Sequence, residues 1–274
     1  MEEKRKHFRS RKRKGSTLSN VILVIAVAVF IFSAYKLINI YSEYHKGDKE
    51  YDNIAEKVVE IQTPNKEEAE KENEQKPKAH VSLKVNFEKL KKINEDTVAW
   101  IQFDEPERIN YPIVQGEDND KYLHTTFEGK KNSSGALFVD VINSGEFVDR
   151  NTFIYGHNMK NGSMFGQLRK YKTKEYYEQN PYFYIYTPDE KEVKYQIFAV
   201  SVVEDTSRSY TRFYNNDEEY LDYLNYLKSI AGYDTGVELT ADSKIISLST
   251  CTNVSETQRL LVHGVKVSET VVGE

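Results

Sequence analysis

The chain has 274 residues, a single cysteine, and 38 basic against 43 acidic side chains, for a formal net charge of −5. A lone thiol excludes an internal disulfide, so Cys251 is either an inert buried residue or a reactive one. Beyond residue 36 the chain is more acidic still, which argues against nucleic acid as a partner, because such partners require a basic face.

The N-terminal segment is basic and then apolar. Residues 1–14 hold a block of Lys and Arg, whereas residues 15–35 carry no charge. An uncharged stretch of this length can cross a bilayer as a helix, and its basic flank predicts a cytoplasmic N-terminus. A cleaved signal peptide is the alternative, but the apolar run ends in a poor match to a cleavage site. We therefore expect a cytoplasmic tail at 1–14, a transmembrane signal anchor at 15–36, and an extracellular remainder.

The segment 37–85 is predicted to be a helical stalk followed by a charged linker. Apolar residues recur at helical spacing from 36 to about 61, and Thr63-Pro64 ends the pattern. Residues 65–79 are almost entirely charged and polar, so they cannot bury a core. An exported domain with one cysteine lacks a disulfide framework, and we expect residues 86–274 to fold around a hydrophobic core of their own.

Short apolar runs bounded by turn residues fill the rest of the chain. We predict strands at 98–103, 111–114, 136–139, 152–155, 182–186, 193–203, 244–248 and 260–267. Strands at this spacing favour a closed or nearly closed β-barrel. Helical patterns are predicted near 87–94, at 119–123 and at 217–231, the last with an Asn/Asp start and a glycine just past its end.

Cys251 ends one of these strands and Arg259 begins the next. Ser, Thr and Asn flank the cysteine, which favours a reachable thiol over an inert buried one. Arg259 could run back alongside Cys251, where its permanent charge would stabilise an anion without transferring a proton. The alternative for Arg259 is a surface ion pair, for instance with Glu256.

His157 ends a strand-like run and precedes a loop, the position from which rigid scaffolds often present reactive groups. His124 follows a short helical turn, and His263 lies inside a strand, where we expect it to pack or form a hydrogen bond. A histidine taken alone is usually structural. Together with Cys251 and Arg259, however, His157 completes a set of nucleophile, acid/base and oxyanion donor that suits acyl transfer.

The sequence contains neither the closely spaced Cys/His pairs of a zinc site nor a Gly-rich phosphate loop. The papain-like and caspase-like signatures are also missing around the cysteine. We therefore predict no metal and no cofactor.

The chain resembles the sortases of Gram-positive bacteria in three segments that follow the family's order: Tyr155–Asn158, Leu248–Cys251, and Arg259 ahead of an apolar strand. The resemblance spans roughly 86–268. It is greatest to class B, in the helix at 217–231, the N-terminal helical extension, Asn110–Gly116 and Ser255–Thr257. It implies a mostly β fold with added helices: an eight-stranded sortase-type β-barrel, with one helix before the cysteine strand.

The resemblance also implies a membrane-anchored cysteine transpeptidase. Cys251 would attack a threonine carbonyl in the C-terminal sorting motif of a surface protein, His157 would protonate the leaving amine, and Arg259 would hold the oxyanion. An amine of a peptidoglycan precursor or stem peptide would then take the acyl group. By the same resemblance, the substrate groove contains Asn119, Leu123, Tyr210, Thr211, Ser249 and Thr250.

Three alternatives remain at this point: a pilin polymerase, a cysteine hydrolase that uses water, and a non-catalytic anchored binding module. The chain also departs from the family pattern in two places. The Cys-to-Arg loop is short, and Asn253 stands where some class B members carry an acidic residue, which puts an Asp-assisted mechanism in doubt. The calcium site of class A has no obvious counterpart.

Overall fold

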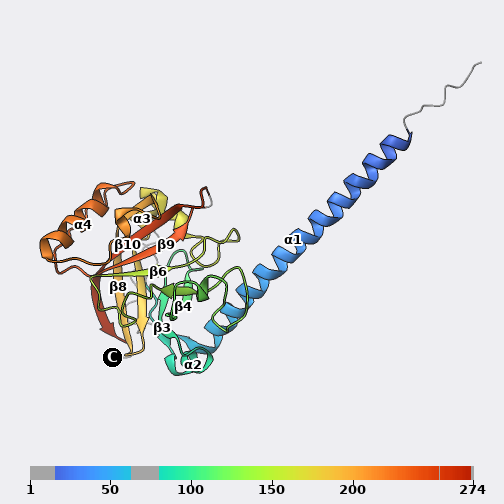
Figure 1. The fold of residues 1–274 in the computed structure, drawn as a ribbon. Helices are drawn as coiled ribbons and strands as arrows, with labels where there is room; N and C mark the ends of the chain where they lie inside the picture. Colours follow the sequence, from blue (N-terminus) through green and yellow to red (C-terminus); the bar gives the residue numbers. More distant parts are fainter. Residues whose placement is uncertain (1–15, 63–79, 253, 273–274) are drawn as a thin grey trace, which may run out of the picture. The chain divides into compact units, whose positions relative to one another are not determined.

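The computed structural model describes residues 16–62, 80–252 and 254–272 (Figure 1). The predicted tail at 1–14, the linker at 65–79 and Asn253 lie outside these ranges. The chain divides into two compact units between residues 43 and 44.

Helix α1, Ser16–Val58, contains the apolar segment predicted to be an anchor. It is long and apolar enough to cross a membrane, with a mean hydropathy of 2.6 in its most apolar window, and none of that window is buried. The predicted anchor and the first part of the predicted stalk are therefore one continuous helix.

The last turns of α1 belong to the same unit as the barrel. Tyr51, Ile54 and Val58 are buried in the main core, and the Tyr51 hydroxyl donates a hydrogen bond to the Gly135 carbonyl at 2.5 Å. The helix ends at Val58 rather than near 61, because β1 (Val59–Ile61) pairs antiparallel with β2 (Leu83–Val85). The compact unit thus begins well before residue 86.

Eight further strands close into a barrel, which confirms the predicted mostly β fold with its added helices (Figure 1). They are β3 Thr97–Gln102, β4 Asn110–Val114, β5 Leu137–Val139, β6 Asn151–Tyr155, β7 Tyr182–Thr187, β8 Lys191–Glu204, β9 Ile245–Cys251 and β10 Gln258–Val271. Their order is β10-β8-β7-β3-β4-β5-β6-β9, and β10 returns to pair with β9. The pairs β4–β5 and β6–β9 are parallel. Strand β9 therefore lies between β6 and β10.

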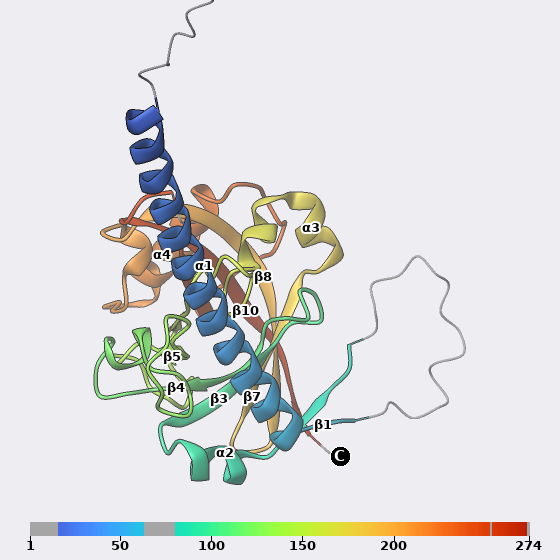
Figure 2. The same ribbon diagram turned by 90° about the vertical axis from the view of Figure 1, so that its right-hand side faces the viewer.

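The helices of this unit are short: α2 Phe87–Ile93, α3 Lys174–Gln179 and α4 Asp217–Ser229, with 3-10 turns η1 Lys121–Leu123, η2 Leu168–Lys172 and η3 Arg208–Tyr210. The helices predicted near 87–94 and at 217–231 are present, and η1 corresponds to the turn predicted at 119–123, whereas η2, η3 and α3 were not predicted. Helices α3 and α4 lie at the opposite end of the barrel from α2 (Figures 1 and 2).

Helix α4 forms where its sequence contains both a cap and an apolar stripe. The Asn216 side chain accepts a hydrogen bond from the Glu219 amide at 2.8 Å, and acidic residues fill the first turn. Its buried face forms a second apolar cluster together with residues of β8, β9 and β10. Along β9, Ile246 belongs to the main core and Ile245 to this second cluster, as strand alternation requires.

A partly buried ionic contact joins His80, which follows the linker, to the barrel. His80 Nδ1 lies 2.7 Å from an Asp104 carboxylate oxygen, and its Nε2 lies 3.2 Å from Glu192. The ring stacks on Tyr184 at 3.4 Å. Burial alone lowers the pKa of His80, but the hydrogen bonds and charges of Asp104 and Glu192 outweigh it and raise the pKa from 6.5 to about 8.

This contact predicts a pH-dependent stability. Because the pKa of His80 is higher in the folded state, its stabilisation is complete below pH 6.5 and is lost as the pH rises through about 8. The loss should be up to about 2 kcal/mol. Urea unfolding between pH 6 and 9 measures it, with His80→Gln as the reference. Equal pH slopes in the two proteins would contradict this assignment.

Candidate active site

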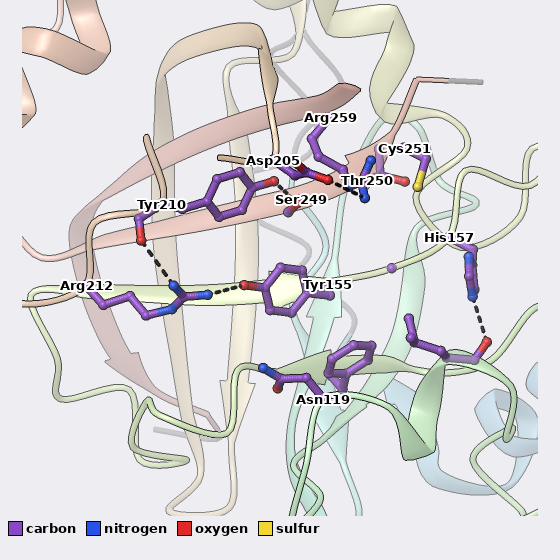
Figure 3. Close-up of a pocket in the computed structure, with 13 residues that line it drawn as sticks. Asn119, Tyr155, His157, Asp205, Tyr210, Arg212, Ser249, Thr250, Cys251 and Arg259 are labelled. Atoms are coloured by element: carbon purple, nitrogen blue, oxygen red, sulfur yellow. Dashed lines mark hydrogen bonds and ion pairs between the residues drawn. The ribbon is translucent and has the colours of Figure 1, made fainter. Parts of the chain in front are cut away.

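A pocket of about 330 Å³ opens where β6 and β9 end side by side (Figure 3). Its walls contain Asn119, Leu123, Phe138, Tyr155, Gly156, His157, Asp205, Tyr210, Arg212, Ser249, Thr250, Cys251 and Arg259. The three predicted catalytic residues and five of the six predicted groove residues therefore line one cavity.

Cys251 and Arg259 are direct cross-strand partners. Cys251 is the last residue of β9, Arg259 is the second of β10, and the antiparallel register pairs them. Directly opposed residues have Cβ atoms about 5 Å apart, so the guanidinium belongs to the immediate surroundings of the thiol. The thiol is partly exposed.

Arg259 is held by both the main chain and a carboxylate. Its Nη1 donates to the Glu256 carbonyl at 2.6 Å and to the Gln258 carbonyl at 3.2 Å. Its Nη2 lies 3.4 Å from the Asp205 carboxylate. The ion pair is thus with Asp205, and the expected alternative partner, Glu256, contributes its backbone oxygen. These contacts fix the guanidinium at the rim of the pocket.

A glycine brings His157 to the end of β9. The Gly156 amide donates to the Ser249 carbonyl at 3.1 Å and so extends the pairing of β6 with β9 by one residue. A Cβ at Gly156 would lie 2.3 Å from a Leu137 methyl and 2.7 Å from the Phe165 ring, which leaves no room for a side chain. Asn158 then donates from Nδ2 to the Cys251 carbonyl at 2.7 Å.

The His157 ring has a defined orientation. Its Nε2 donates to the Leu123 carbonyl at 2.7 Å, which leaves Nδ1 as the proton acceptor of the neutral ring. The Cys251 sulfur points toward the side of the pocket that holds this ring (Figure 3). Leu123 thus contributes its backbone to the site as well as its side chain.

The surroundings of His157 favour its neutral form. Burial lowers its pKa, and the nearby His124, whose ring centroid is 6.2 Å away, lowers it further, while the hydrogen bond to the Leu123 carbonyl acts in the opposite direction. The net effect is a pKa below the usual 6.5. Imidazolium therefore forms at lower pH here than in a solvated histidine.

We expect the acid limb of kcat/KM to fall below pH 6.5 for this reason. Below that limb His157 is protonated at both ring nitrogens and can no longer accept a proton at Nδ1. A pH profile with a saturable peptide substrate measures the limb. His124→Gln should move it to higher pH, because His124 then no longer lowers the pKa of His157. A wild-type limb at or above 6.5 would contradict the lowered pKa.

Two of the predicted groove residues touch each other. The Tyr210 and Ser249 hydroxyls are 2.8 Å apart, and the Tyr210 ring stacks on Phe153 at 5.5 Å. The Thr250 hydroxyl is buried and has no hydrogen-bond partner among the described residues. Thr211 is not among the residues that line the pocket, because its hydroxyl donates to the Arg208 carbonyl at 2.8 Å.

The far side of the pocket contains an ion pair between Arg212 and the buried Asp140, which the sequence did not reveal. Asp140 has no exposed side-chain surface and accepts hydrogen bonds from Arg212 at 2.5 and 2.8 Å and from the Tyr155 hydroxyl at 2.8 Å. Asn119 donates to the same carboxylate at 3.2 Å. The pKa of Asp140 is lowered despite its burial, because the Ile142 amide, which donates to it at 3.1 Å, and these side-chain donors stabilise the anion. Asn119 therefore acts partly by bracing this pair.

The remaining buried histidine is structural, as expected. His263 is fully buried in β10, its Nδ1 lies 2.8 Å from the Ser247 hydroxyl, and burial lowers its pKa to about 3. It is therefore neutral at any pH at which the protein functions. The stretch from Ile245 to Cys251 thus has one polar face, on which Ser247 turns toward His263 and Ser249 toward Tyr210.

Comparison with known proteins gives a consistent family. A family model described as Sortase domain matches residues 102–267. A second model, described as Sigma factor regulator N-terminal, matches residues 5–98, which is less than half of the chain. Sortase B of Listeria monocytogenes is 31% identical over 260 residues, which cover 93% of this chain and 98% of that protein.

Solved structures agree with the sequence comparison. The crystal structure of sortase B from B. anthracis in complex with AAEK1 has a TM-score of 0.68 and 31% identity, and the match covers 84% of this chain and 100% of that one. The Staphylococcus aureus sortase B–substrate complex has a TM-score of 0.62 and 29% identity, with 66% of this chain and 84% of that one covered.

Proposed function

This chain belongs to the sortase family, as a class B member and a cysteine transpeptidase, and we propose that Cys251, His157 and Arg259 carry its reaction. The observation that carries the assignment is the register of β9 and β10, which pairs Cys251 with Arg259. His157 lies in the same pocket, and its proton-accepting Nδ1 is left free by the Leu123 hydrogen bond.

In the first half of the reaction, the Cys251 thiolate attacks the carbonyl carbon of a threonine in the sorting motif of a surface protein. The carbonyl oxygen becomes an oxyanion, which the Arg259 guanidinium stabilises. As the C–N bond breaks, the proton that His157 Nδ1 took from the Cys251 thiol passes to the leaving amine. The products are a thioester on Cys251 and a free peptide that begins after the threonine.

In the second half, an amine of the cell wall attacks the thioester. Neutral His157 accepts the amine proton at Nδ1, a new amide bond forms, and the Cys251 thiolate leaves. We infer a peptidoglycan precursor or stem-peptide amine as the acceptor. The lowered pKa of His157 supports its role as a base, since a ring that is mostly neutral can take up this proton.

We further propose that α1 anchors the enzyme in the cell membrane as a single pass through residues 15–36, with the tail at 1–14 in the cytoplasm and the barrel outside. The uncharged apolar stretch and its basic flank support this topology. The linker within 37–85 and the catalytic part at 86–274 then lie on the same side as the cell-wall substrates. No cofactor is required by this chemistry.

Product analysis tests the proposal. The full chain in detergent is incubated with a panel of sorting peptides, with and without a stem-peptide amine, and the products are identified by mass spectrometry. We expect cleavage after threonine and an amide-ligated product that requires the amine. Hydrolysed peptide alone across suitable amines would identify a hydrolase, ligation only to a pilin lysine would identify a pilin polymerase, and no cleavage would defeat the proposal.

A further inference from the structure

One wall of the pocket, next to β9, is a loop that depends on α4. The segment 205–216 connects β8 to α4 and supplies three pocket residues, Asp205, Tyr210 and Arg212. The segment contains a single 3-10 turn, η3, and no strand, so its own backbone hydrogen bonds do little to fix it.

Helix α4 contacts residues 207–209 of this loop at three points. The Tyr223 hydroxyl donates to the Ser209 carbonyl at 2.8 Å. The Tyr226 hydroxyl lies 3.3 Å from the Ser207 hydroxyl. Asp222 forms an ion pair with Arg208, whose guanidinium also lies 4.9 Å from the Tyr226 ring centroid. Of the three, only the Tyr223 contact is fully buried, so it is the one that water cannot replace.

The Tyr223 hydroxyl also links the loop to the catalytic strands. It accepts a hydrogen bond from Asn151 Nδ2 at 3.0 Å, and Asn151 Oδ1 accepts one from the Ser247 hydroxyl at 2.8 Å. Asn151 begins β6, the strand that leads to His157, and Ser247 lies in β9, the strand that ends at Cys251. The Ser247 hydroxyl also lies 2.8 Å from Nδ1 of His263. Because His263 is neutral, this hydrogen-bond network contains no charged side chain.

Loss of the Tyr223 hydrogen bond should affect the pocket, because the residue that it holds is the neighbour in the chain of a pocket residue. Ser209 is completely buried and directly precedes Tyr210, whose hydroxyl meets Ser249 in the groove. A buried carbonyl without a donor costs about 1–3 kcal/mol, so on losing Tyr223 the Ser209 backbone should shift toward water. Tyr210 and Arg212 would shift with it.

We propose that Tyr223 is a positioning residue that holds Tyr210 on the groove wall through Ser209 and thereby sets the affinity for the sorting peptide. It does so without touching substrate. This inference rests on the proposed function, because it needs a peptide in that groove.

The test is a KM-against-kcat comparison of Tyr223→Phe with Tyr220→Phe. Tyr220 is an equally buried tyrosine of α4 whose hydroxyl bonds the Arg150 and Ser243 carbonyls at 2.8 and 2.7 Å, away from the pocket. We expect Tyr223→Phe to raise KM for the peptide about fivefold, the equivalent of about 1 kcal/mol, with kcat within about twofold. Tyr220→Phe should leave both constants unchanged. Equal KM values in the two variants would overturn the proposal.

A double-mutant cycle adds a readout that general destabilisation cannot mimic. If Tyr223 acts through Tyr210, Tyr210→Phe and the double variant should have the same KM, whereas independent effects would multiply and overturn the proposal. If Tyr223→Phe does not fold, Tyr226→Phe takes its place, with a rise of about twofold expected and an unchanged KM counting against the proposal. Wild-type turnover is measured first, because its absence would defeat the proposed function instead.

Discussion

Replacing Cys251 by alanine is expected to abolish peptide turnover, with a loss in kcat of at least about 10⁴-fold. The pocket offers no second thiol, since Cys251 is the only cysteine of the chain. Ser249 and Thr250 also line the pocket, but a neutral hydroxyl is a far weaker nucleophile than a thiolate. Steady-state cleavage of a fluorogenic sorting peptide measures the loss.

The control for this variant is a measurement of its free energy of unfolding. Cys251 is partly exposed at the end of a strand, so truncation should leave the free energy of unfolding within about 1 kcal/mol of wild type. Ser249→Ala provides a matched change two residues earlier on the same face of β9, and it should keep most of kcat. Turnover by Cys251→Ala close to that of wild type would remove the thiol from the mechanism.

Arg259→Ala should lower kcat by about 10² to 10³-fold with a smaller change in KM, the signature of a group that acts mainly on the oxyanion. Arg259→Lys should recover little of this. One ammonium cannot bond the Glu256 carbonyl, pair with Asp205 and still face the substrate as a planar guanidinium can. Single-turnover kinetics with saturating peptide separate the two constants.

Arg108→Ala is the matched control for the arginine variants. Arg108 forms a comparable ion pair with Asp48 at 2.6 Å, outside the pocket, and its removal should change kcat by less than about twofold. If Arg259→Ala instead raised KM and left kcat intact, Arg259 would be a substrate-binding residue and not an oxyanion donor.

The barrel could be predicted from the sequence because each strand is marked by a pattern of neighbouring residues. Each strand is a short apolar run between turn residues, and all eight predicted runs coincide with barrel strands. The pairing of Cys251 with Arg259 was also predictable, since two strands joined by a short loop almost always become antiparallel neighbours. His157 could be singled out because it follows a strand end.

The rest of the site depends on contacts between distant segments. Asp140 and Arg212 are 72 positions apart, and neither carries a motif that predicts their pairing. The Leu123 carbonyl that orients His157 is a backbone atom, which no residue pattern can mark. Thr211 was placed in the groove by resemblance alone, and the direction of its side chain is set by the local turn.

The N-terminal start of the compact unit also depends on contacts between distant segments, so it could not be predicted from the sequence. Periodicity predicted a helix after the anchor, but it could not indicate that Tyr51 and Ile54 are buried in the barrel's core. Strands β1 and β2 are three residues each and pair across the linker, so their signal lies in a partner far along the chain. Only the folded unit shows that this helix end supports the barrel.

The most direct test of the central claim is the mass of the enzyme during turnover, measured on the intact protein and then on its digested peptides. Full-length protein is mixed with a sorting peptide in the absence of amine, quenched in acid and digested. The account predicts a thioester that adds the peptide up to its threonine, located on Cys251 and discharged when a stem-peptide amine is supplied. Turnover without any adduct on Cys251, or an adduct on another residue, would contradict it.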